Sequence, residues 1–336
     1  MAKKSHVKPH LFHTAYGVTE AQLEKLGVFN PTLNVDTLLF PDPLLLEESS
    51  HAEMRAAKPT FENYFDRVRR LVAGSKSDSD APAKAAKEFL RFPEIKGTCL
   101  GYGKDGIAGS GGGVDMAHQL FKTASEIVSL GIDDPDLFLA MGLFEDNFGP
   151  DMIGDMFTNV VFDHIADFNR RVYGALGLKT KKIEVRLNNG ARLSGDFVIN
   201  VCYPGAEIPV ILLPKDILRD LPIAVDWRGV QEASETNREF RRGLNKSVAN
   251  LWSKKTLESK DKLRTWALSG RDAFGDLLDM VHGHDGKPYD FAGDKLGELI
   301  WRSIGQEIVS KYPFTIKKAV SSSGNRTHQD YGRYNI

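Results

Sequence analysis

The sequence predicts an α+β fold that is mainly helical, with a small antiparallel β-sheet at about residues 183–213 between helical regions. Apolar residues recur at helical spacing along most of the 336 residues, and from Lys182 the pattern changes to the alternation typical of strands. The hydrophobic content of 41% and the charged content of 26% are those of an ordinary globular protein. Two cysteines are too few for a disulfide framework, and no apolar run is long enough to span a bilayer, so we expect a cytoplasmic protein.

Five regions are expected along the chain. Residues 1–60 form an irregular N-terminal segment, because prolines interrupt its short apolar runs. Residues 61–178 form a helical region that contains a glycine-rich loop and an acidic helix. Residues 179–225 form the small sheet, residues 226–320 are helical and basic, and residues 321–336 form a flexible tail.

Three helices are predicted before the acidic part of the chain. Apolar residues at helical spacing place them at Phe61 to Ala73, Ala83 to Phe92 and Val114 to Ser129. Asp133 is expected to cap the short helix that follows.

The predicted sheet has three strands. Ile183 to Leu187 alternates between apolar and polar residues, Asn188 to Gly190 is a turn, and Ala191 to Val201 returns as the second strand. Ile208 to Leu213 is almost entirely apolar, which predicts a third and more buried strand.

A row of carboxylates and one amide is the most unusual feature of the sequence. Gly149-Pro150 opens what is predicted to be one helix, and four-residue spacing puts the row on a single face of it. The row is either a solvated face, an intramolecular partner for the basic part of the chain, a divalent-cation site, or a docking face for a basic protein. Its members are Asp151, Asp155, Asn159, Asp163 and Asp167.

The cation hypothesis uses the acids around the turn at Phe148 to Asp151. Hard cations such as Mg²⁺ or Mn²⁺ prefer clustered carboxylate oxygens. The candidate ligands are Glu145, Asp146, Asp151 and Asp155.

Positive charge concentrates in a later segment, so the formal net charge of -1 conceals strong segregation. Basic helices with interleaved aromatic residues, here Trp252 and Trp266, can follow a phosphate backbone. Alternatively, both tryptophans pack in the core and the cations face water. The candidate nucleic-acid contacts are Arg241, Arg242, Lys246, Lys254, Lys255, Lys260, Lys262 and Arg264.

Three shorter motifs are less specific. The glycines at 101, 103 and 106 match a dinucleotide-binding pattern, but no strand and helix flank them in the required way, so a tightly turning loop is expected. His282, His284 and Asp285 fit a polar turn more readily than a metal site. Glu94-Ile-Lys96 matches half of a nuclease motif, an acid two residues before a lysine.

Three stretches resemble a family of uncharacterised bacterial proteins associated with phage defence and restriction. They are FPEIKGTCLGYGKDGIAGSG, LFEDNFGPDMIGDMFTNVV and PVILLPKDILRDLP. The second stretch keeps Gly149, Asp151, Asp155 and Asn159 of the family string but has Gly154 in place of its usual serine. Longer members carry a C-terminal PD-(D/E)XK nuclease domain, and no counterpart of that domain is recognised in this chain.

The resemblance implies an accessory or sensing subunit of a bacterial antiviral (phage) defence system, which binds nucleic acid, a nuclease partner or both. The alternatives are a divalent-metal-dependent nuclease that uses the acidic cluster and a structural oligomerisation module. Enzymatic activity stays open, because Asp196 on the predicted hairpin has no acid-x-lysine partner at Lys215. The expected partners are a nuclease or ATPase subunit, DNA, or a second copy of the chain.

Overall fold

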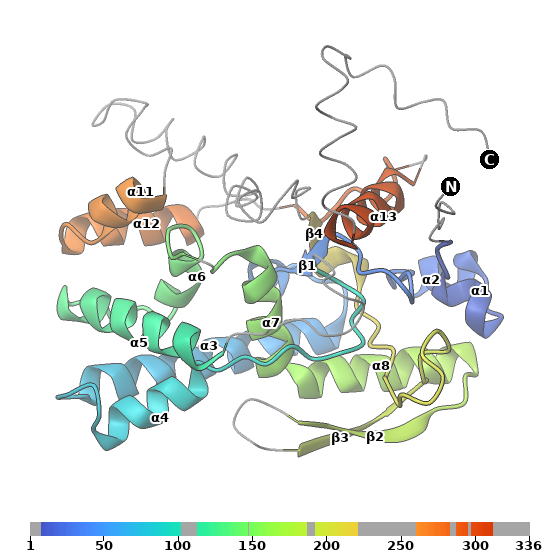
Figure 1. Cartoon of the computed structure of the whole chain (residues 1–336), viewed down its shortest axis with the longest axis horizontal. Helices are drawn as coiled ribbons and strands as arrows, with labels where there is room; N and C mark the ends of the chain where they lie inside the picture. Colours follow the sequence, from blue (N-terminus) through green and yellow to red (C-terminus); the bar gives the residue numbers. More distant parts are fainter. Residues whose placement is uncertain are drawn as a thin grey trace, which may run out of the picture.

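The structure is a computed structural model of the chain. It describes residues 8–101, 113–146, 148–186, 192–220, 260–282, 287–294 and 297–311. Helices dominate, and two small antiparallel sheets lie among them, which confirms the predicted α+β class (Figure 1). Among the described helices, none is both long and apolar enough to cross a membrane.

The central helix is α3, Ala52–Gly74, against which four other helices pack. It begins nine residues before the predicted start at Phe61, and it contains Pro59. Aromatic rings fill the space beneath it, and the Phe65 and Phe138 ring centroids lie 5.0 Å apart. The packed helices are α4 (Ala81–Phe89), α5 (Val114–Ser129), α7 (Pro150–Val160) and α8 (Phe162–Leu176).

From residue 8 onward, the N-terminal segment contains short helices and a short strand. Its elements are short, and Phe12, Leu38 and Leu39 are fully buried. Tertiary packing therefore stabilises these elements, which have no clear periodicity in the sequence. The elements are α1 (Phe12–Tyr16), α2 (Glu20–Lys25), β1 (Leu39–Pro41) and the 3₁₀ turn η1 (Pro43–Leu45).

The predicted hairpin is confirmed, but the predicted third strand is wrong. β2 (Lys181–Arg186) pairs with β3 (Arg192–Phe197), with Ile183 opposite Gly195. Residues 208–213 are extended and largely buried, yet only an isolated bridge joins Pro209 to Ile199. Proline has no N–H for a ladder, and both polar groups of the Leu212 main chain bond the Asn169 side chain instead, each at 2.8 Å.

The second sheet joins distant parts of the chain. β1 pairs with β4 (Leu218–Asp220), and the 3₁₀ turn η2 (Lys215–Ile217) immediately precedes β4. Helix α7 packs closely on β1. A Cβ added to Gly154 would lie only 3.2 Å from Pro41 Cδ. The missing side chain at Gly154, where the resembling family has serine, therefore permits this contact.

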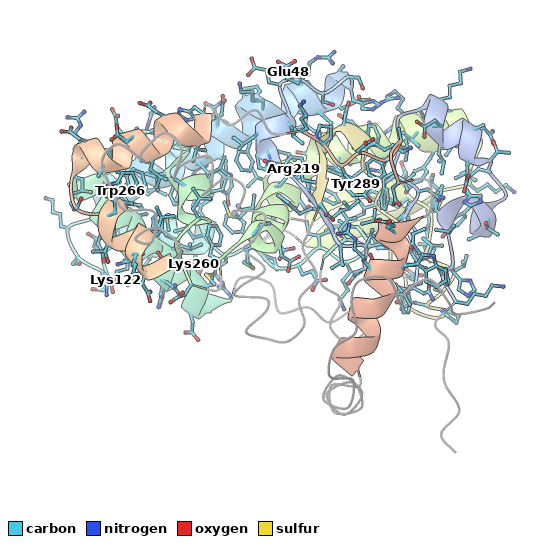
Figure 2. All side chains as sticks on the ribbon, turned by 90° about the horizontal axis from the view of Figure 1, so that it is seen from above. Glu48, Lys122, Arg219, Lys260, Trp266 and Tyr289 are labelled. Carbon is cyan, nitrogen blue, oxygen red and sulfur yellow. The ribbon has the colours of Figure 1, made fainter. Side chains whose placement is uncertain are left out.

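Three helices lie among the described residues of the C-terminal part of the chain. α11 (Lys260–Ala267) and α12 (Arg271–His282) form a pair at one end of the molecule, and α12 packs on α6 (Leu137–Met141). α13 (Glu298–Lys311) lies near β1 and β4, where Arg302 donates two hydrogen bonds to the Asp220 carboxylate. Figure 2 shows Lys260 and Trp266 on the helical pair, and Arg219 close to Tyr289. The tail at 321–336 lies outside the described residues.

Candidate functional site

Helix α7 and the stretch before the glycine-rich segment come together at Asn159. The Asn159 Nδ2 donates hydrogen bonds to the main-chain oxygen of Pro93 at 2.7 Å and to that of Asp155 at 2.9 Å. The residue is 3% exposed, and its Oδ1 has no hydrogen-bond partner among the described residues. Asn159 therefore fixes the chain next to Glu94 against the helix that carries Asp155.

The stretch from Gly97 to Gly101 is held on both sides by main-chain hydrogen bonds. Ile211 N donates to Gly97 O at 2.7 Å, and Thr37 N donates to Cys99 O at 2.8 Å. Gly97 has a φ of 110°, and a Cβ there would lie 2.1 Å from the main-chain oxygen of Pro209. Only glycine fits such a contact, so this residue lets the strand-like segment at 208–213 approach.

Gly101 brings the same stretch against the start of α7. Its φ is 117°, and a Cβ would lie 2.8 Å from Asp151 Oδ1. The three stretches that carry the family resemblance are thus neighbours in space, since the first contacts α7 through Gly101 and Pro93 and contacts residues 209–211 through Gly97.

Three carboxylates gather at this junction, which we call the carboxylate cluster: Glu94, Asp151 and Asp155. Burial raises the pKa of Asp155 well above its usual range, and the negative charges of Asp151 and then Glu94 raise it further. The ionised form of Asp155 is therefore disfavoured, and a proton or a bound cation at Asp155 would relieve the repulsion.

A small polar cavity of about 40 Å³ adjoins the cluster. Glu94 and Lys96 both line it, together with Asp36, Thr98 and Tyr203. The volume suits water or an ion rather than a nucleotide. Glu94 and Lys96 form the acid-x-lysine pair that matched half of a nuclease motif. This pair lies beside two aspartates of α7.

The four acids of the predicted cation site are not brought together. Among the described residues, the one group of three or more Asp, Glu, His or Cys ligand atoms within 4.8 Å of one another is Asp134, Asp136 and His282. Asp151 and Asp155 remain neighbours, whereas Glu145 is buried elsewhere and Asp146 is exposed. Glu94, which the sequence did not connect with the row, takes their place beside Asp155.

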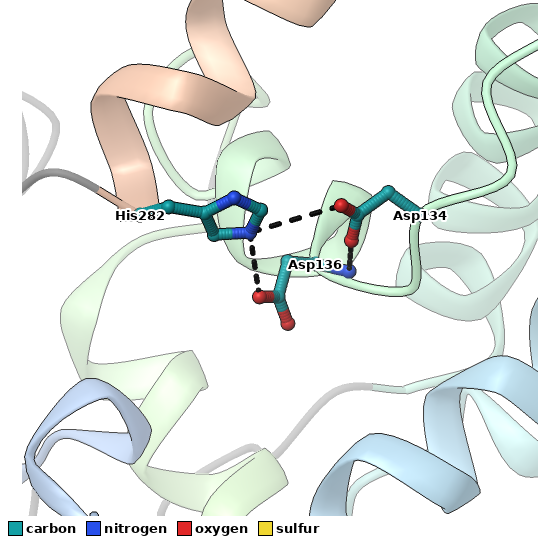
Figure 3. Close-up of side chains that lie close together, drawn as sticks. All are labelled: Asp134, Asp136 and His282. Carbon is teal, nitrogen blue, oxygen red and sulfur yellow. Dashed lines mark hydrogen bonds and ion pairs between the residues drawn. The ribbon is translucent and has the colours of Figure 1, made fainter.

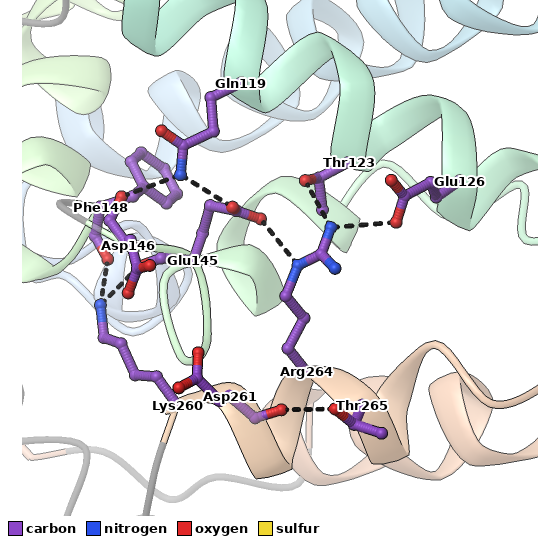
Figure 4. A network of polar contacts seen from close by, with 10 residues as sticks. All are labelled: Gln119, Thr123, Glu126, Glu145, Asp146, Phe148, Lys260, Asp261, Arg264 and Thr265. Carbon is purple, nitrogen blue, oxygen red and sulfur yellow. Dashed lines mark hydrogen bonds and ion pairs between the residues drawn. The ribbon is translucent and has the colours of Figure 1, made fainter.

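Glu145 is instead the centre of a network with α11 (Figure 4). Its Oε1 accepts a hydrogen bond from Gln119 Nε2 at 2.8 Å, and its Oε2 lies 3.8 Å from Arg264 Nε. Arg264 also donates to Glu126 Oε2 at 2.9 Å. Lys260 Nζ donates to the main-chain oxygens of Glu145 at 2.5 Å and Phe148 at 3.0 Å.

Two of the predicted nucleic-acid contacts are therefore used within the chain. Lys260 and Arg264 join α11 to Glu145, which precedes the acidic row and is not a member of it. Lys262 is exposed, and Trp266, at 6% exposure, packs in the core. The remaining candidates, and Trp252, lie outside the described residues: Arg241, Arg242, Lys246, Lys254 and Lys255.

The acidic row does not lie on one helix. Val161, with φ −107° and ψ 21°, separates α7 from α8, and the buried side chains of Val161 and Phe162 fix the break. No proline or glycine marks it, so no local signal in the sequence could have predicted it. Asp163 and Asp167 on α8 are exposed, and Asp167 pairs with Arg170 at 2.5 Å. The docking face therefore loses the buried Asn159 and retains Asp163 and Asp167 as its exposed members.

Of three minor predictions, one is wrong and two lie mostly outside the described residues. Asp133 does not cap α6, because the helix begins after Asp136, and Asp134 Oδ1 accepts from Asp136 N at 2.8 Å instead. Of the dinucleotide-like pattern only Gly101 lies among the described residues, and of the His-Gly-His-Asp motif only His282 does.

Comparison with known proteins gives one family. No curated protein and no solved structure matches the chain. Residues 17–226 match a family described as Domain of unknown function (DUF8370). The match covers more than half of the chain and contains the whole carboxylate cluster, whereas α11, α12 and α13 lie beyond it. The chain therefore belongs to the DUF8370 family.

Proposed function

We propose that the chain is a divalent-cation-dependent nuclease of a bacterial antiviral defence system, and that its cation binds at Glu94, Asp151 and Asp155. The observation that carries the proposal is the meeting of the Glu94-Ile-Lys96 stretch with the two aspartates of α7, through the Asn159 hydrogen bond and the close approach of Gly101 to Asp151. Two acids and an acid-x-lysine pair are thus combined at one place. The β2–β3 hairpin lacks this combination.

Electrostatics favours a cation at this site. Ionised carboxylates have the same charge sign as a phosphodiester, so a divalent ion that offsets their charge would favour the approach of nucleic acid. Mg²⁺ or Mn²⁺ held by these oxygens would lower the pKa of a bound water and stabilise charge on the phosphate. Glu94 and Asp151 would bind the ion, Asp155 would bind it in its ionised form, and Lys96 would face the phosphate from the exposed rim.

The supporting framework is well fixed. Asn159 anchors the main chain beside Glu94, and the bonds of Gly97, Cys99 and Gly101 hold the following stretch. Catalytic groups need such support, since a displacement of about 1 Å in their position reduces rates strongly. The family resemblance of the three converging stretches supports the assignment to phage defence.

The spacing of the carboxylates supports a second candidate, the accessory or sensing subunit. The oxygens of Glu94, Asp151 and Asp155 do not form a group within 4.8 Å, so side-chain rotation must precede shared binding of one ion. A chain that binds cation and DNA without cutting would act as this subunit, with Asp163 and Asp167 available for a basic protein partner.

The test is DNA cleavage and DNA binding by the full chain in Mg²⁺ and in Mn²⁺. Cleavage that falls at least roughly tenfold in Glu94→Gln, Asp151→Asn and Asp155→Asn supports the nuclease. Asp167→Asn on α8 is the matched control, because it removes an equal charge outside the cluster. Binding without cleavage in both metals would replace the nuclease with the accessory subunit. Cleavage that survives all three cluster substitutions would overturn the site.

A further inference from the structure

A second group of donor atoms joins the turn before α6 to the end of α12 and shares no residue with the carboxylate cluster. His282, the last residue of α12, has its Nε2 2.9 Å from Asp136 Oδ2 and 3.8 Å from Asp134 Oδ2 (Figure 3). One ligand atom from each of the three residues lies within 4.8 Å of the others. The side chains are partly exposed, at 42% for His282, 34% for Asp134 and 24% for Asp136, so an ion from solution can reach them.

Local structure holds the two aspartates in place. Asp134 Oδ1 accepts a hydrogen bond from the main-chain N of Asp136 at 2.8 Å, which fixes the turn through Pro135 before α6. His282 arrives from an element 146 residues later, carried by the packing of α12 on α6. The other carboxylate oxygen of Asp134, Oδ2, and the Oδ2 of Asp136 face the imidazole (Figure 3).

The donor set specifies a class of ion. Imidazole nitrogen suits transition metals such as Zn²⁺, whereas carboxylate oxygen also suits Mn²⁺. Three protein donors with room for water resemble an open coordination shell rather than a closed structural site. We propose that Asp134, Asp136 and His282 bind one divalent transition-metal ion of the Zn²⁺ or Mn²⁺ class.

The surroundings favour a cation. A cavity of about 400 Å³ lies alongside, between the turn and α12, and its acidic lining residues are Asp133, Asp134, Asp272, Asp276 and Asp279, with Arg271 as the basic one. Of the three donor residues, Asp134 lines this cavity, so the cavity lies next to the donor group. A bound cation would offset the negative charge of these carboxylates.

The ion would connect two parts of the molecule. Asp134 and Asp136 lie within the region that matches the family, whereas His282 lies beyond it. Binding would thus fasten α12, and with it α11, to the α5–α6 turn. Since only the folded chain brings these three donors together, the ion would stabilise the native state in proportion to its concentration.

The experiment is calorimetric titration of the full chain, stripped with a chelator, with Zn²⁺ and with Mn²⁺, alongside thermal melts. We expect one ion per chain at this site and a rise in Tm with Zn²⁺ or Mn²⁺. In His282→Gln, and separately in Asp136→Asn, the affinity for Zn²⁺ falls at least roughly tenfold and the rise in Tm with Zn²⁺ is lost. Glutamine can still donate to Asp136 and position 282 is exposed, so His282→Gln is expected to fold, as its circular dichroism will show.

Two controls separate this site from others. His118→Gln removes an exposed histidine of α5 and is expected to leave the titration unchanged. Asp155→Asn disrupts the carboxylate cluster and is likewise expected to leave transition-metal binding at His282 intact, so the two proposals fail independently. Equal affinity in wild type and His282→Gln, or no heat of binding with either metal, would overturn the proposal.

Discussion

Asn159 and Pro93 are joined by a hydrogen bond of 2.7 Å from the side-chain amide to the main-chain oxygen. The bond connects α7 to the residue immediately before Glu94, although 66 residues separate the two in sequence. It explains why the acidic row of α7 contains an asparagine at this position: an amide can donate to a carbonyl, and a carboxylate cannot. The bond positions Glu94 beside Asp155.

Replacing Asn159 tests this relationship. We expect Asn159→Ala to reduce the free energy of unfolding by about 1–2 kcal/mol, because the Pro93 oxygen loses its donor in a partly buried site. Urea unfolding measures the change. Asp163→Asn, on the exposed face of α8, serves as control and is expected to stay within about 0.5 kcal/mol of wild type. Equal stability of the two variants would show that the bond contributes little.

The raised pKa of Asp155 predicts a pH dependence of stability. Because this carboxyl binds its proton more tightly in the folded chain than in the unfolded chain, its contribution to stability falls as pH rises from the unfolded pKa of about 3.9 through the higher folded pKa. Asp155→Asn removes this loss. The free energy of unfolding of the variant, relative to wild type, is therefore expected to rise with pH across that window.

Urea unfolding at several pH values measures the relative stability of Asp155→Asn. A carbon NMR titration of the Asp155 carboxyl gives a second readout. Asp151→Asn is expected to move the pKa of Asp155 downward, since it removes a neighbouring negative charge. Parallel stability curves for wild type and Asp155→Asn would contradict the assignment.

Arg264 is expected to stabilise the chain through Glu145. Arg264→Ala leaves the buried Glu145 carboxylate with Gln119 as its remaining described side-chain partner, and we expect a loss of about 1–2 kcal/mol after allowance for solvent at the partly exposed arginine. In the Glu145→Gln background the same substitution is expected to cost less, because no charge is left unpaired. A double-mutant cycle measures this coupling, and additive effects of the two substitutions would refute it.

Gly101 is expected to accept no side chain. Gly101→Ala places a Cβ 2.8 Å from Asp151 Oδ1 at a φ of 117°, so we expect a loss of stability of about 1–3 kcal/mol. Gly174→Ala is the matched control, because Gly174 lies inside α8 and a Cβ added there would meet nothing within 4 Å. That variant is expected to gain about 0.4–1 kcal/mol. Similar thermal melts for both variants would contradict the close approach of Gly101 to α7.

Much of the secondary structure was predictable because its signals are local. Val114 to Ser129 is a helix with the predicted bounds, Gly149-Pro150 opens α7, and β2 pairs with β3 in the predicted antiparallel order. Each rests on a period or on a turn residue that a short window of sequence contains. Asp151 and Asp155 were likewise predicted to be neighbours, since four-residue spacing places both on one face of a helix.

Which residues meet depends on contacts that no short window of sequence contains. The pairing of β1 with β4 and the bond from Asn159 to Pro93 join residues far apart along the chain. Packing of buried Val161 also divides the acidic row, although no breaking residue marks the site. The residue types that could bind a cation are evident from the sequence, because carboxylate chemistry belongs to the side chain itself. Their grouping is a property of the folded chain, since burial and long-range hydrogen bonds place Glu94, rather than Glu145, beside Asp155.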